Sequence, residues 1–340
     1  MTRQRQFDLV AVGGGSGLAT LLRGLKEAVG TRLDELTAIV TVADDGGSSG
    51  RLRRDFGVLP PGDIRNCLVA LARDEHLVAQ LFQYRFANGQ GLSGHSFGNL
   101  LLTALTGITG DFYQAILTAE ELLSVRGRIL PATLQDLRLR ARGRSGRVYE
   151  GESAVGSSGE PLVALELEPA RAAAFPAAVA AIREADLIVL GPGSLYTSIL
   201  PNLLIPGIAA AVRSRRAEGV PVVLPLNLMT QPGETDGMDA TAHVEALARH
   251  LGANLVDRVL VHSGELPQEA TELYAVVDSY PVEVDPVGLA ELGSEVVACD
   301  LLAAGELVRH DPAKLRRAVL SELGRMEAGV SGAARRVEVS

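Results

Sequence analysis

The sequence predicts an α/β protein in which a mostly parallel sheet is flanked by helices. Short apolar runs of strand type alternate with segments of helical periodicity along most of the chain. Continuous apolar runs are typical of strands that are buried on both faces of a sheet. The chain has 340 residues and 47% of them are apolar, which is enough for one large α/β domain or two ordinary ones.

The predicted elements follow this alternation from the start of the chain. Strands are expected at 7–12, 36–42, 186–190, 220–228 and 258–262. Helices are expected at 16–28, 63–86, 98–123, 171–184, 207–218, 239–250 and 312–326. Residues 128–168 differ, because LRLRAR and LVALELE alternate apolar and polar residues on either side of the Gly- and Ser-rich GESAVGSSGE. We expect antiparallel hairpins there, forming a small subdomain inserted in a single domain of residues 1–326, with 327–340 as a flexible tail.

Charge and composition narrow the classes of partner. The net charge of -9 argues against a nucleic acid or an anionic membrane as the main partner, because both require concentrated positive charge. No run approaches the ~18 apolar residues of a membrane span. The polar start MTRQRQ leads directly into a strand-like segment, so we expect a cytoplasmic protein without membrane insertion. Cys67 and Cys299 are expected to be reduced and buried. Only Lys26 and Lys314 are lysines, so phosphate is expected to meet arginines and backbone amides.

The first chemical signal is the loop GGGSG at 13–17, between the first predicted strand and the first helix. Glycines there let the backbone approach a phosphate, and amides at the helix start face its charge, with Ser16 as the expected cap. Leu18 stands where the dinucleotide fingerprint needs its third glycine, and the lysine of a P-loop is missing from the loop. A tight turn without a ligand is the alternative interpretation.

The second signal is ADDGGSSGR at 43–51, after the second predicted strand. Asp44 and Asp45 could hold ribose hydroxyls or Mg²⁺, and the turn with Ser48 and Ser49 could hold phosphate. Adjacent residues of an extended strand point in opposite directions, so we expect one aspartate to face the ligand and the other to cap the turn. An Asp-Gly turn without function is the alternative.

Two further polar segments open predicted helices. In PPGDIRN, Asp63 can cap the helix, while Arg65 beside Asn66 opposes the helix dipole and indicates a nearby anion. An ordinary helix start explains this segment equally well. In GHSFGN, His95 precedes a helix start that contains Asn99. A lone histidine there is more often a cap than a catalyst, although the setting matches the other loops.

Two more loops follow later strands. GPGSLYTS at 191–198, with Gly193 and Ser194, is expected to form a second anion cradle. Two cradles on one parallel sheet suit a diphosphate or a phosphosugar. Asn227 and Thr230, after the next strand, could bind sugar hydroxyls or a base edge. Five or six such loops at one edge of a sheet predict a site for a nucleotide-class ligand.

Longer segments carry a resemblance. VAVGGGSGLATLLRGLK, IVTVADDGGSSGRLR, LPPGDIRNCLVALA, GHSFGNLLLTAL, ADLIVLGPGSLYTSILPNLL and NLMTQPGET resemble the YvcK-like gluconeogenesis factor family of the CofD-like superfamily, over about 7–325. The resemblance implies a Rossmann-like three-layer α/β/α fold, a cytoplasmic location, and a regulatory role linking carbon metabolism to cell shape and envelope synthesis. It also implies a UDP-sugar ligand such as UDP-N-acetylglucosamine, with NAD(P) as another dinucleotide that the site could take. Regulatory protein partners in envelope synthesis and a homo-oligomer are compatible with it.

Arg309, in Arg309-His310-Asp311, matches a terminal Arg-His-Asp segment of this family, and Ser16 stands where the family usually has threonine. A planar arginine suits a diphosphate; the alternative is a helix-start cluster in which Asp311 caps the helix. The residues of the loops and of the resemblance together are the candidate ligand-binding set: Gly14, Gly15, Ser16, Gly17, Asp44, Asp45, Ser48, Ser49, Asn66, His95, Asn99, Gly193, Ser194, Asn227, Thr230 and Arg309.

Three functions remain open from the sequence. The first is a UDP-sugar-binding regulator, for which no catalytic residue is assigned. The second is a Mg²⁺-dependent transferase of the 2-phospho-L-lactate type, in which Asp44, Asp45 and Asp63 hold metal or accept a proton. The third is an NAD(P)-binding protein, whose dehydrogenase form the broken fingerprint disfavours.

Overall fold

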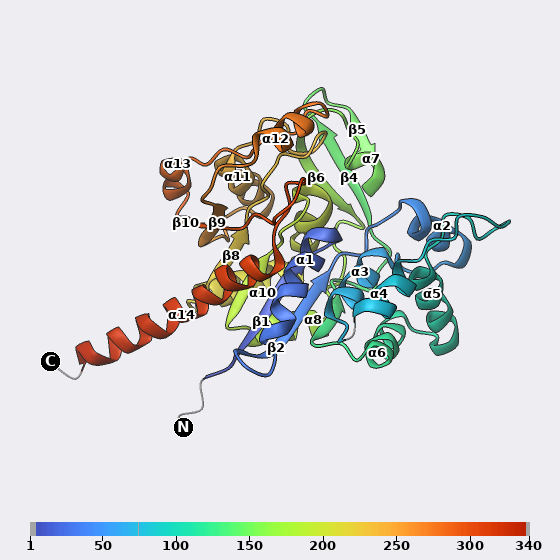
Figure 1. Cartoon of the computed structure of the whole chain (residues 1–340), viewed down its shortest axis with the longest axis horizontal. Coiled ribbons are helices and arrows are strands. Elements are labelled where there is room, and N and C mark those ends of the chain that lie inside the picture. Colours follow the sequence, from blue (N-terminus) through green and yellow to red (C-terminus); the bar gives the residue numbers. More distant parts are fainter. Residues whose placement is uncertain (1–4, 74, 338–340) are drawn as a thin grey trace.

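The main sheet organises the molecule (Figure 1). The structure, a computed structural model, describes residues 5–73 and 75–337. Seven strands lie in the order β10-β9-β8-β7-β1-β2-β3, and every neighbouring pair is parallel. They are β1 (Phe7–Gly13), β2 (Leu33–Val40), β3 (Arg128–Pro131), β7 (Leu187–Leu190), β8 (Val222–Pro225), β9 (Arg258–His262) and β10 (Glu295–Cys299). The prediction of a mostly parallel sheet is confirmed.

The sequence missed the two outermost strands, β3 and β10. The five predicted runs are long and apolar because their strands are buried from both sides, as Val10, Ala11 and Val12 of β1 are. β10 is partly exposed at the sheet edge and carries Glu295, and β3 is only four residues long. Edge strands need less apolar sequence, so they give a weaker pattern.

Helices cover both faces of the sheet. α1 (Gly15–Leu25) packs against α3 (Gly62–Leu71) and α14 (Pro312–Val337) on one face, while α8 (Pro176–Glu184) packs against α10 (Pro206–Ala217) on the other. The remaining helical segments are η1 (Lys26–Ala28), α2 (Gly47–Phe56), α4 (Glu75–Gln83), α5 (Phe97–Thr109), α6 (Phe112–Leu123), α7 (Glu152–Val155), η2 (Leu195–Ile199), α9 (Leu200–Leu203), α11 (Ala240–Leu251), α12 (Gln268–Ala275) and α13 (Pro286–Glu291). These layers confirm the three-layer α/β/α expectation.

One predicted long helix, 98–123, is two helices. Gly110 ends α5 in the left-handed conformation at φ 72°, which suits a glycine. The Asp111 carboxylate accepts the Gln114 amide hydrogen at 2.8 Å and so caps α6. The prediction of one continuous helix was wrong because the apolar period continues across this break.

A small antiparallel sheet, in the order β5-β4-β6, stands apart from the main sheet (Figure 1). Its strands are β4 (Arg138–Gly143), β5 (Val148–Glu150) and β6 (Leu162–Glu168). Alternate residues of β4 are exposed and buried, as its sequence pattern predicts. The predicted inserted sheet is therefore present. The inserted sheet begins after β3 and not at residue 128, because the run RILP of β3 pairs with β2 in the main sheet. α14 continues to Val337, through much of the predicted tail.

The strand order reverses between β1 and β7. From β1 the chain builds outward to β2 and β3, whereas from β7 it builds the other way to β8, β9 and β10. In open α/β sheets, ligands bind outside the carboxyl ends of the strands at such a switch point. The fold therefore places the loops after β1 and β7 on opposite sides of one crevice.

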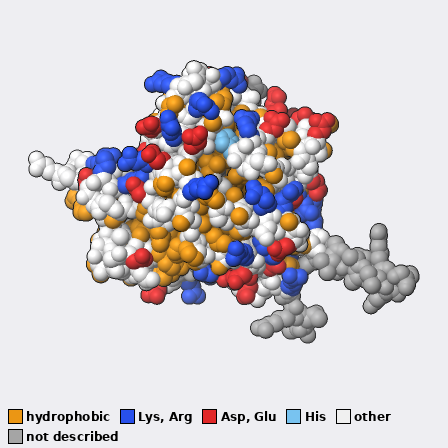
Figure 2. Space-filling model, turned by 180° about the vertical axis from the view of Figure 1, so that it is seen from behind, with side chains coloured by type: hydrophobic (Ala, Val, Ile, Leu, Met, Phe, Trp, Pro, Cys, Tyr) orange, Lys and Arg blue, Asp and Glu red, His pale blue; other side chains and the backbone are white. Residues whose placement is uncertain are grey.

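Charged side chains, apolar helices and cysteines are the remaining features on which the sequence makes predictions. Basic and acidic side chains are interspersed over the face shown in Figure 2, rather than gathered in one stripe. No single helix of the described chain meets the length and apolarity of a membrane span, although one pair, Leu195–Leu203 and Pro206–Ala217, bent by 79°, meets them jointly. Both cysteines are free; Cys67 is buried, but Cys299 is only half-buried because it lies on the edge strand β10.

Candidate functional site

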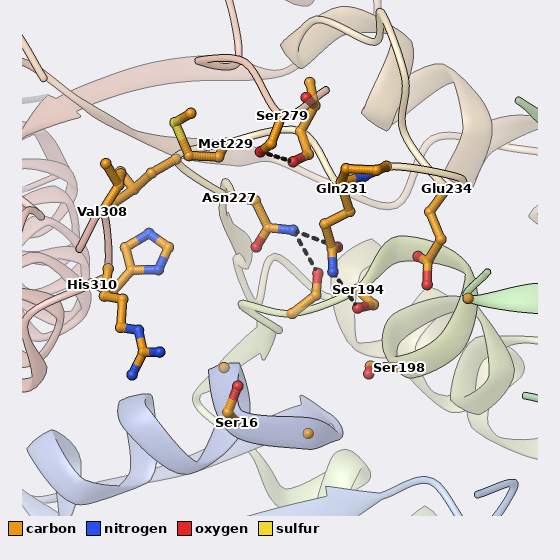
Figure 3. Close-up of a pocket in the computed structure, with 18 of the residues that line it drawn as sticks. Ser16, Ser194, Ser198, Asn227, Met229, Gln231, Glu234, Ser279, Val308 and His310 are labelled. Atoms are coloured by element: carbon orange, nitrogen blue, oxygen red, sulfur yellow. Dashed lines mark hydrogen bonds between the residues drawn. The ribbon is translucent and has the colours of Figure 1, made fainter. Parts of the chain in front are cut away.

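A cavity of about 590 Å³ opens at the switch point (Figure 3). Its walls come from the loops after β1, β7 and β8 and from the segment that precedes α14. We call it the switch-point cavity. The candidate residues that line it are Gly14, Gly15, Ser16, Gly17, Gly193, Ser194, Asn227, Thr230 and Arg309.

The loop after β1 presents backbone amides to this cavity. Gly14 is the N-cap of α1 and has no side chain to cap the helix, but the Asp63 carboxylate accepts the amide hydrogen of Gly15. The predicted cap, Ser16, was wrong: it lies two residues past the N-cap, inside the helix. The amides of Ser16 and Gly17 have no side-chain partner among the described residues, and together with the helix dipole they favour an anion at this end. A Cβ on Gly17 would lie 2.4 Å from the carbonyl oxygen of Pro192, so the close approach of the two loops requires glycine.

The loops after β1, β7 and β8 are joined by side-chain amides. Asn202 Nδ2 donates to the carbonyl oxygen of Gly13 at 3.1 Å. Asn227 Nδ2 donates to the carbonyl oxygen of Gly193 at 3.0 Å, and Gln231 Nε2 donates to Ser194 Oγ at 2.7 Å (Figure 3). These bonds fix the polar wall of the cavity before any ligand arrives.

Arg309 and His310 supply a cation and a neutral acceptor. Arg309 is exposed, and its guanidinium has no ion pair or side-chain hydrogen bond within residues 5–73 and 75–337. His310 Nε2 lies 3.1 Å from the carbonyl oxygen of Leu226, which can only accept, so this nitrogen carries the proton. Burial lowers the pKa of His310 to about 4, so the ring is neutral at physiological pH and Nδ1 is an acceptor. Asp311 caps α14 through the Lys314 amide at 2.8 Å, which confirms that part of the alternative interpretation.

Glu234 closes the opposite wall. Its carboxylate accepts hydrogen bonds from Thr197 Oγ1 at 2.9 Å and from the amide of Tyr196 at 3.4 Å. Burial raises the pKa of Glu234 to about 7. The carboxyl is therefore partly protonated near neutral pH, which reduces its repulsion of an anionic ligand.

An acidic cluster lies beside the cavity and consists of Asp44, Asp45, Asp63 and Glu152. Asp63 accepts the amide hydrogen of Gly15, and burial raises the pKa of Asp63 to about 6. Burial, followed by repulsion from the aspartates, raises the pKa of Glu152 to about 8. None of the four residues lines the switch-point cavity. The hydrogen bond from Gly15 to Asp63 joins the cluster to the loop after β1.

The aspartates of this cluster hold backbone. Asp44 Oδ1 accepts the amide hydrogen of Gly46 at 2.9 Å, which is the predicted turn-capping role. Asp45 Oδ1 accepts the amide hydrogen of Ser153 in α7 at 2.9 Å, so it anchors the small sheet. The prediction that Asp63 caps α3 was wrong, because Pro61 is the N-cap and the Asp63 carboxylate points back to α1.

The cluster is not a protein-built metal cage. Among the described residues, no three His, Cys, Asp or Glu side chains are arranged to hold one metal ion. Mg²⁺, however, is commonly held by one or two carboxylates together with phosphates of the ligand and water. Asp63 and Asp44 are the residues of the cluster that could supply these one or two carboxylates.

The other candidate residues lie in a second polar network, outside the cavity. Ser48 Oγ is 3.0 Å from His95 Nδ1, and Asn99 Nδ2 donates to Ser49 Oγ at 3.2 Å. His95 does not cap α5, because Ser96 does. Arg65 donates to Asn66 Oδ1, Asn99 Oδ1 and Ser96 Oγ, so the guanidinium that indicated an anion is bonded to neutral side chains.

Several lining residues are absent from the candidate set. Gln231, Glu234 and Ser198 lie inside the conspicuous loops, and His310 lies in the Arg-His-Asp segment, so a signal was present for each. No sequence signal marked Ser279, since it lies after α12 in a stretch without a recognisable motif. Its hydroxyl donates to the carbonyl oxygen of Thr230 at 2.6 Å.

Comparisons with known proteins agree with this geometry. Residues 9–302 match the family described as 2-phospho-L-lactate transferase CofD. The gluconeogenesis factor of Halalkalibacterium halodurans is 45% identical over 317 residues, covering 93% of this chain and 96% of that protein. The gluconeogenesis factor of Bacillus subtilis is 46% identical over 304 residues, covering 89% of this chain and 94% of that protein.

A solved structure is also similar. A crystal structure of a member of the UPF0052 family from Bacillus halodurans superimposes with a TM-score of 0.88 at 44% identity, covering 93% of this chain and 100% of that one. The similarity therefore covers almost the whole length of both chains. The chain therefore belongs to the CofD family, among its gluconeogenesis factors.

Proposed function

We propose that the protein binds a UDP-sugar of the UDP-N-acetylglucosamine type in the switch-point cavity and acts as a cytoplasmic regulator that links carbon metabolism to cell shape and envelope synthesis. The observation that carries this proposal is the pair of glycine loops, after β1 and β7, that face one cavity at the point where the strand order reverses. A diphosphate between them would accept hydrogen bonds from the amides of Ser16 and Gly17 at the start of α1. Arg309 would neutralise part of its charge.

The remaining wall suits a sugar. Ser194, Gln231 and Asn227 offer hydroxyl and amide groups, and His310 Nδ1 offers an acceptor on a ring that burial keeps neutral. Sugar hydroxyls both donate and accept, so a mixed neutral wall binds them well. A protein partner in envelope synthesis would distinguish the ligand-bound protein from the free protein. This role requires no catalysis.

Isothermal titration with UDP-N-acetylglucosamine, UDP-glucose and NAD tests the proposal. We expect a UDP-sugar to bind, and the Arg309→Ala variant to bind it about 10- to 100-fold more weakly, since a charge-assisted contact to phosphate is lost. Arg144→Ala, in the exposed turn between β4 and β5, is the matched control and is expected to bind like the wild type. No binding of any UDP-sugar by the wild type would overturn the proposal, and tight binding of NAD alone would favour the NAD(P) alternative.

A Mg²⁺-dependent transferase is the second candidate, and the match to the transferase family favours it. Asp63 bonds to the cavity loop, so Asp63 and Asp44 could share Mg²⁺ with the phosphates of a nucleotide diphosphate. Mg²⁺ would neutralise charge on the diphosphate. Phosphorus NMR of protein, Mg²⁺ and nucleotide-sugar separates the candidates: a new phosphate resonance indicates transfer or hydrolysis, whereas unchanged spectra with saturated binding support the regulator.

A further inference from the structure

A second cavity, of about 430 Å³, adjoins the switch-point cavity. The two share Asn227 and Leu228 in their walls. Helix α12 also lines both, with Tyr274 on the first cavity and Thr271 on the second. A ligand that extends from the glycine loops past Asn227 therefore enters the second cavity.

The walls of the second cavity are mostly apolar. Leu226, Leu228 and Val261 are buried at the ends of β8 and β9, and Leu266 and Val282 lie opposite on later segments. This surface offers little to a sugar or a phosphate, both of which need many hydrogen-bond partners. It suits a flat, weakly polar group such as a nucleobase.

His262 provides a hydrogen-bond donor at this cavity. Its Nδ1 accepts the amide hydrogen of Leu301 at 3.2 Å, and a backbone amide can only donate, so the neutral ring carries its proton on Nε2. The His262 side chain is 10% exposed, and Nε2 is buried without a hydrogen-bond partner within the described residues. The backbone of Gly264, which also lines this cavity, lies against it: a Cβ on Gly264 would be 3.1 Å from Nε2. An unsatisfied buried donor costs about 1–3 kcal/mol, so an acceptor that reaches it gains affinity.

Asn227 provides an acceptor at the junction of the two cavities. Its Nδ2 donates to the carbonyl oxygen of Gly193 at 3.0 Å and to Gln231 Oε1 at 3.2 Å. A carbonyl oxygen cannot donate, so these bonds fix which end of the amide is nitrogen. The side-chain oxygen of Asn227 is left to accept a hydrogen bond from a ligand.

We infer that the second cavity binds the base of the nucleotide and selects a base whose edge carries a carbonyl next to an N–H. This inference rests on the proposed function, because the phosphates must lie in the switch-point cavity. His262 Nε2–H would donate to the base carbonyl, and the Asn227 oxygen would accept from the ring N–H. Uracil presents this pair of groups. Cytosine presents an amino group and an unprotonated ring nitrogen instead, which places donor against donor and acceptor against acceptor.

Titration of the wild-type protein with UDP and with CDP tests the inference without any substitution. The two ligands share ribose and diphosphate and differ only at the base edge. We expect UDP to bind about 10- to 100-fold more tightly, since the wrong edge leaves two buried polar groups unpaired. Equal affinities would overturn the inference while leaving the proposed function intact. Absence of binding by every uridine nucleotide would overturn both.

A pair of histidine variants locates the selectivity. His262→Phe keeps a flat ring but removes the donor, and we expect it to bring the UDP to CDP affinity ratio near one. His243→Phe is the matched control, because His243 is also buried with an unpartnered Nε2 but lines neither cavity. It is expected to keep the wild-type ratio. Thermal unfolding checks that both variants fold, and a ratio unchanged in a folded His262→Phe would assign the selectivity elsewhere and overturn the inference.

Discussion

In the switch-point cavity, polar groups are left for a ligand, whereas in the neighbouring acidic cluster they are used by the protein itself. Beyond Gly15, the amides that open α1 have no side-chain partner among the described residues, and neither has Arg309. In the cluster, Asp44 and Asp45 accept backbone hydrogen bonds, and Asp63 is bonded to Gly15. The two regions come from the same kind of sequence, a glycine- and serine-rich loop after a buried strand. The number of polar groups without a hydrogen-bond partner, and not the composition of the loop, therefore distinguishes the switch-point cavity from the acidic cluster.

Replacing Gly17 should have the largest effect on the cavity. In Gly17→Val, a side chain must occupy the position 2.4 Å from the carbonyl oxygen of Pro192, so α1 or the loop after β7 has to move. We expect loss of detectable UDP-sugar binding and a decrease of about 3 kcal/mol in the free energy of unfolding. Titration calorimetry and urea unfolding measure the two effects.

Gly107→Val provides the contrast for this experiment. Gly107 is an exposed glycine of α5, and a Cβ there meets no atom within 4 Å. The substitution should change stability by less than about 1 kcal/mol and leave binding intact. If Gly17→Val binds the ligand as the wild type does, the two loops are not held together by close contact.

These two glycines show how far the sequence could predict the site. The glycine loops after β1 and β7 were identifiable, because a buried strand followed by glycine is a local pattern. The partners of Ser48, Asn99 and Arg65 were not, because they depend on how α2, α3 and α5 pack, which local patterns do not encode. The sequence singled out Gly17, but the contact with Pro192 that requires a glycine there follows only from the packing of the two loops. The same reason hid Ser279, which reaches the cavity through a bond to Thr230.

Glu152 should make the free energy of unfolding depend on pH. Its pKa is raised from an ordinary 4.5 to about 8 by burial and by the nearby aspartates. Between these two pH values the unfolded chain has released this proton while the folded chain still holds it, so stability falls as the pH rises through this window. Glu152→Gln should remove that part of the decrease and make the protein about 2 kcal/mol more stable than the wild type at pH 8.5.

Urea unfolding at pH 5.5, 7 and 8.5 measures this difference. Glu150→Gln is the control on the same small sheet, because its side chain is 78% exposed. A Glu152→Gln protein that loses stability with rising pH as steeply as the wild type would contradict the buried, repelled state of this carboxyl. The contrast between the switch-point cavity and the acidic cluster would then rest on their hydrogen bonds alone.

A matched pair of serines gives the smallest and most specific test. Ser48 and Ser194 both lie in glycine-rich loops, and each has one side-chain hydrogen bond within the described chain. Ser48 Oγ is paired with His95 Nδ1 at 3.0 Å, and Ser194 Oγ accepts from Gln231 Nε2 at 2.7 Å. Ser194 lines the cavity and Ser48 does not. We expect Ser194→Ala to weaken UDP-sugar binding about 10-fold, through loss of a hydroxyl that holds the wall and meets the ligand. Ser48→Ala should lower the free energy of unfolding by about 1 kcal/mol and change the Kd by less than about twofold. A larger loss of affinity in Ser48→Ala would mean that the ligand extends from the cavity into the network around His95.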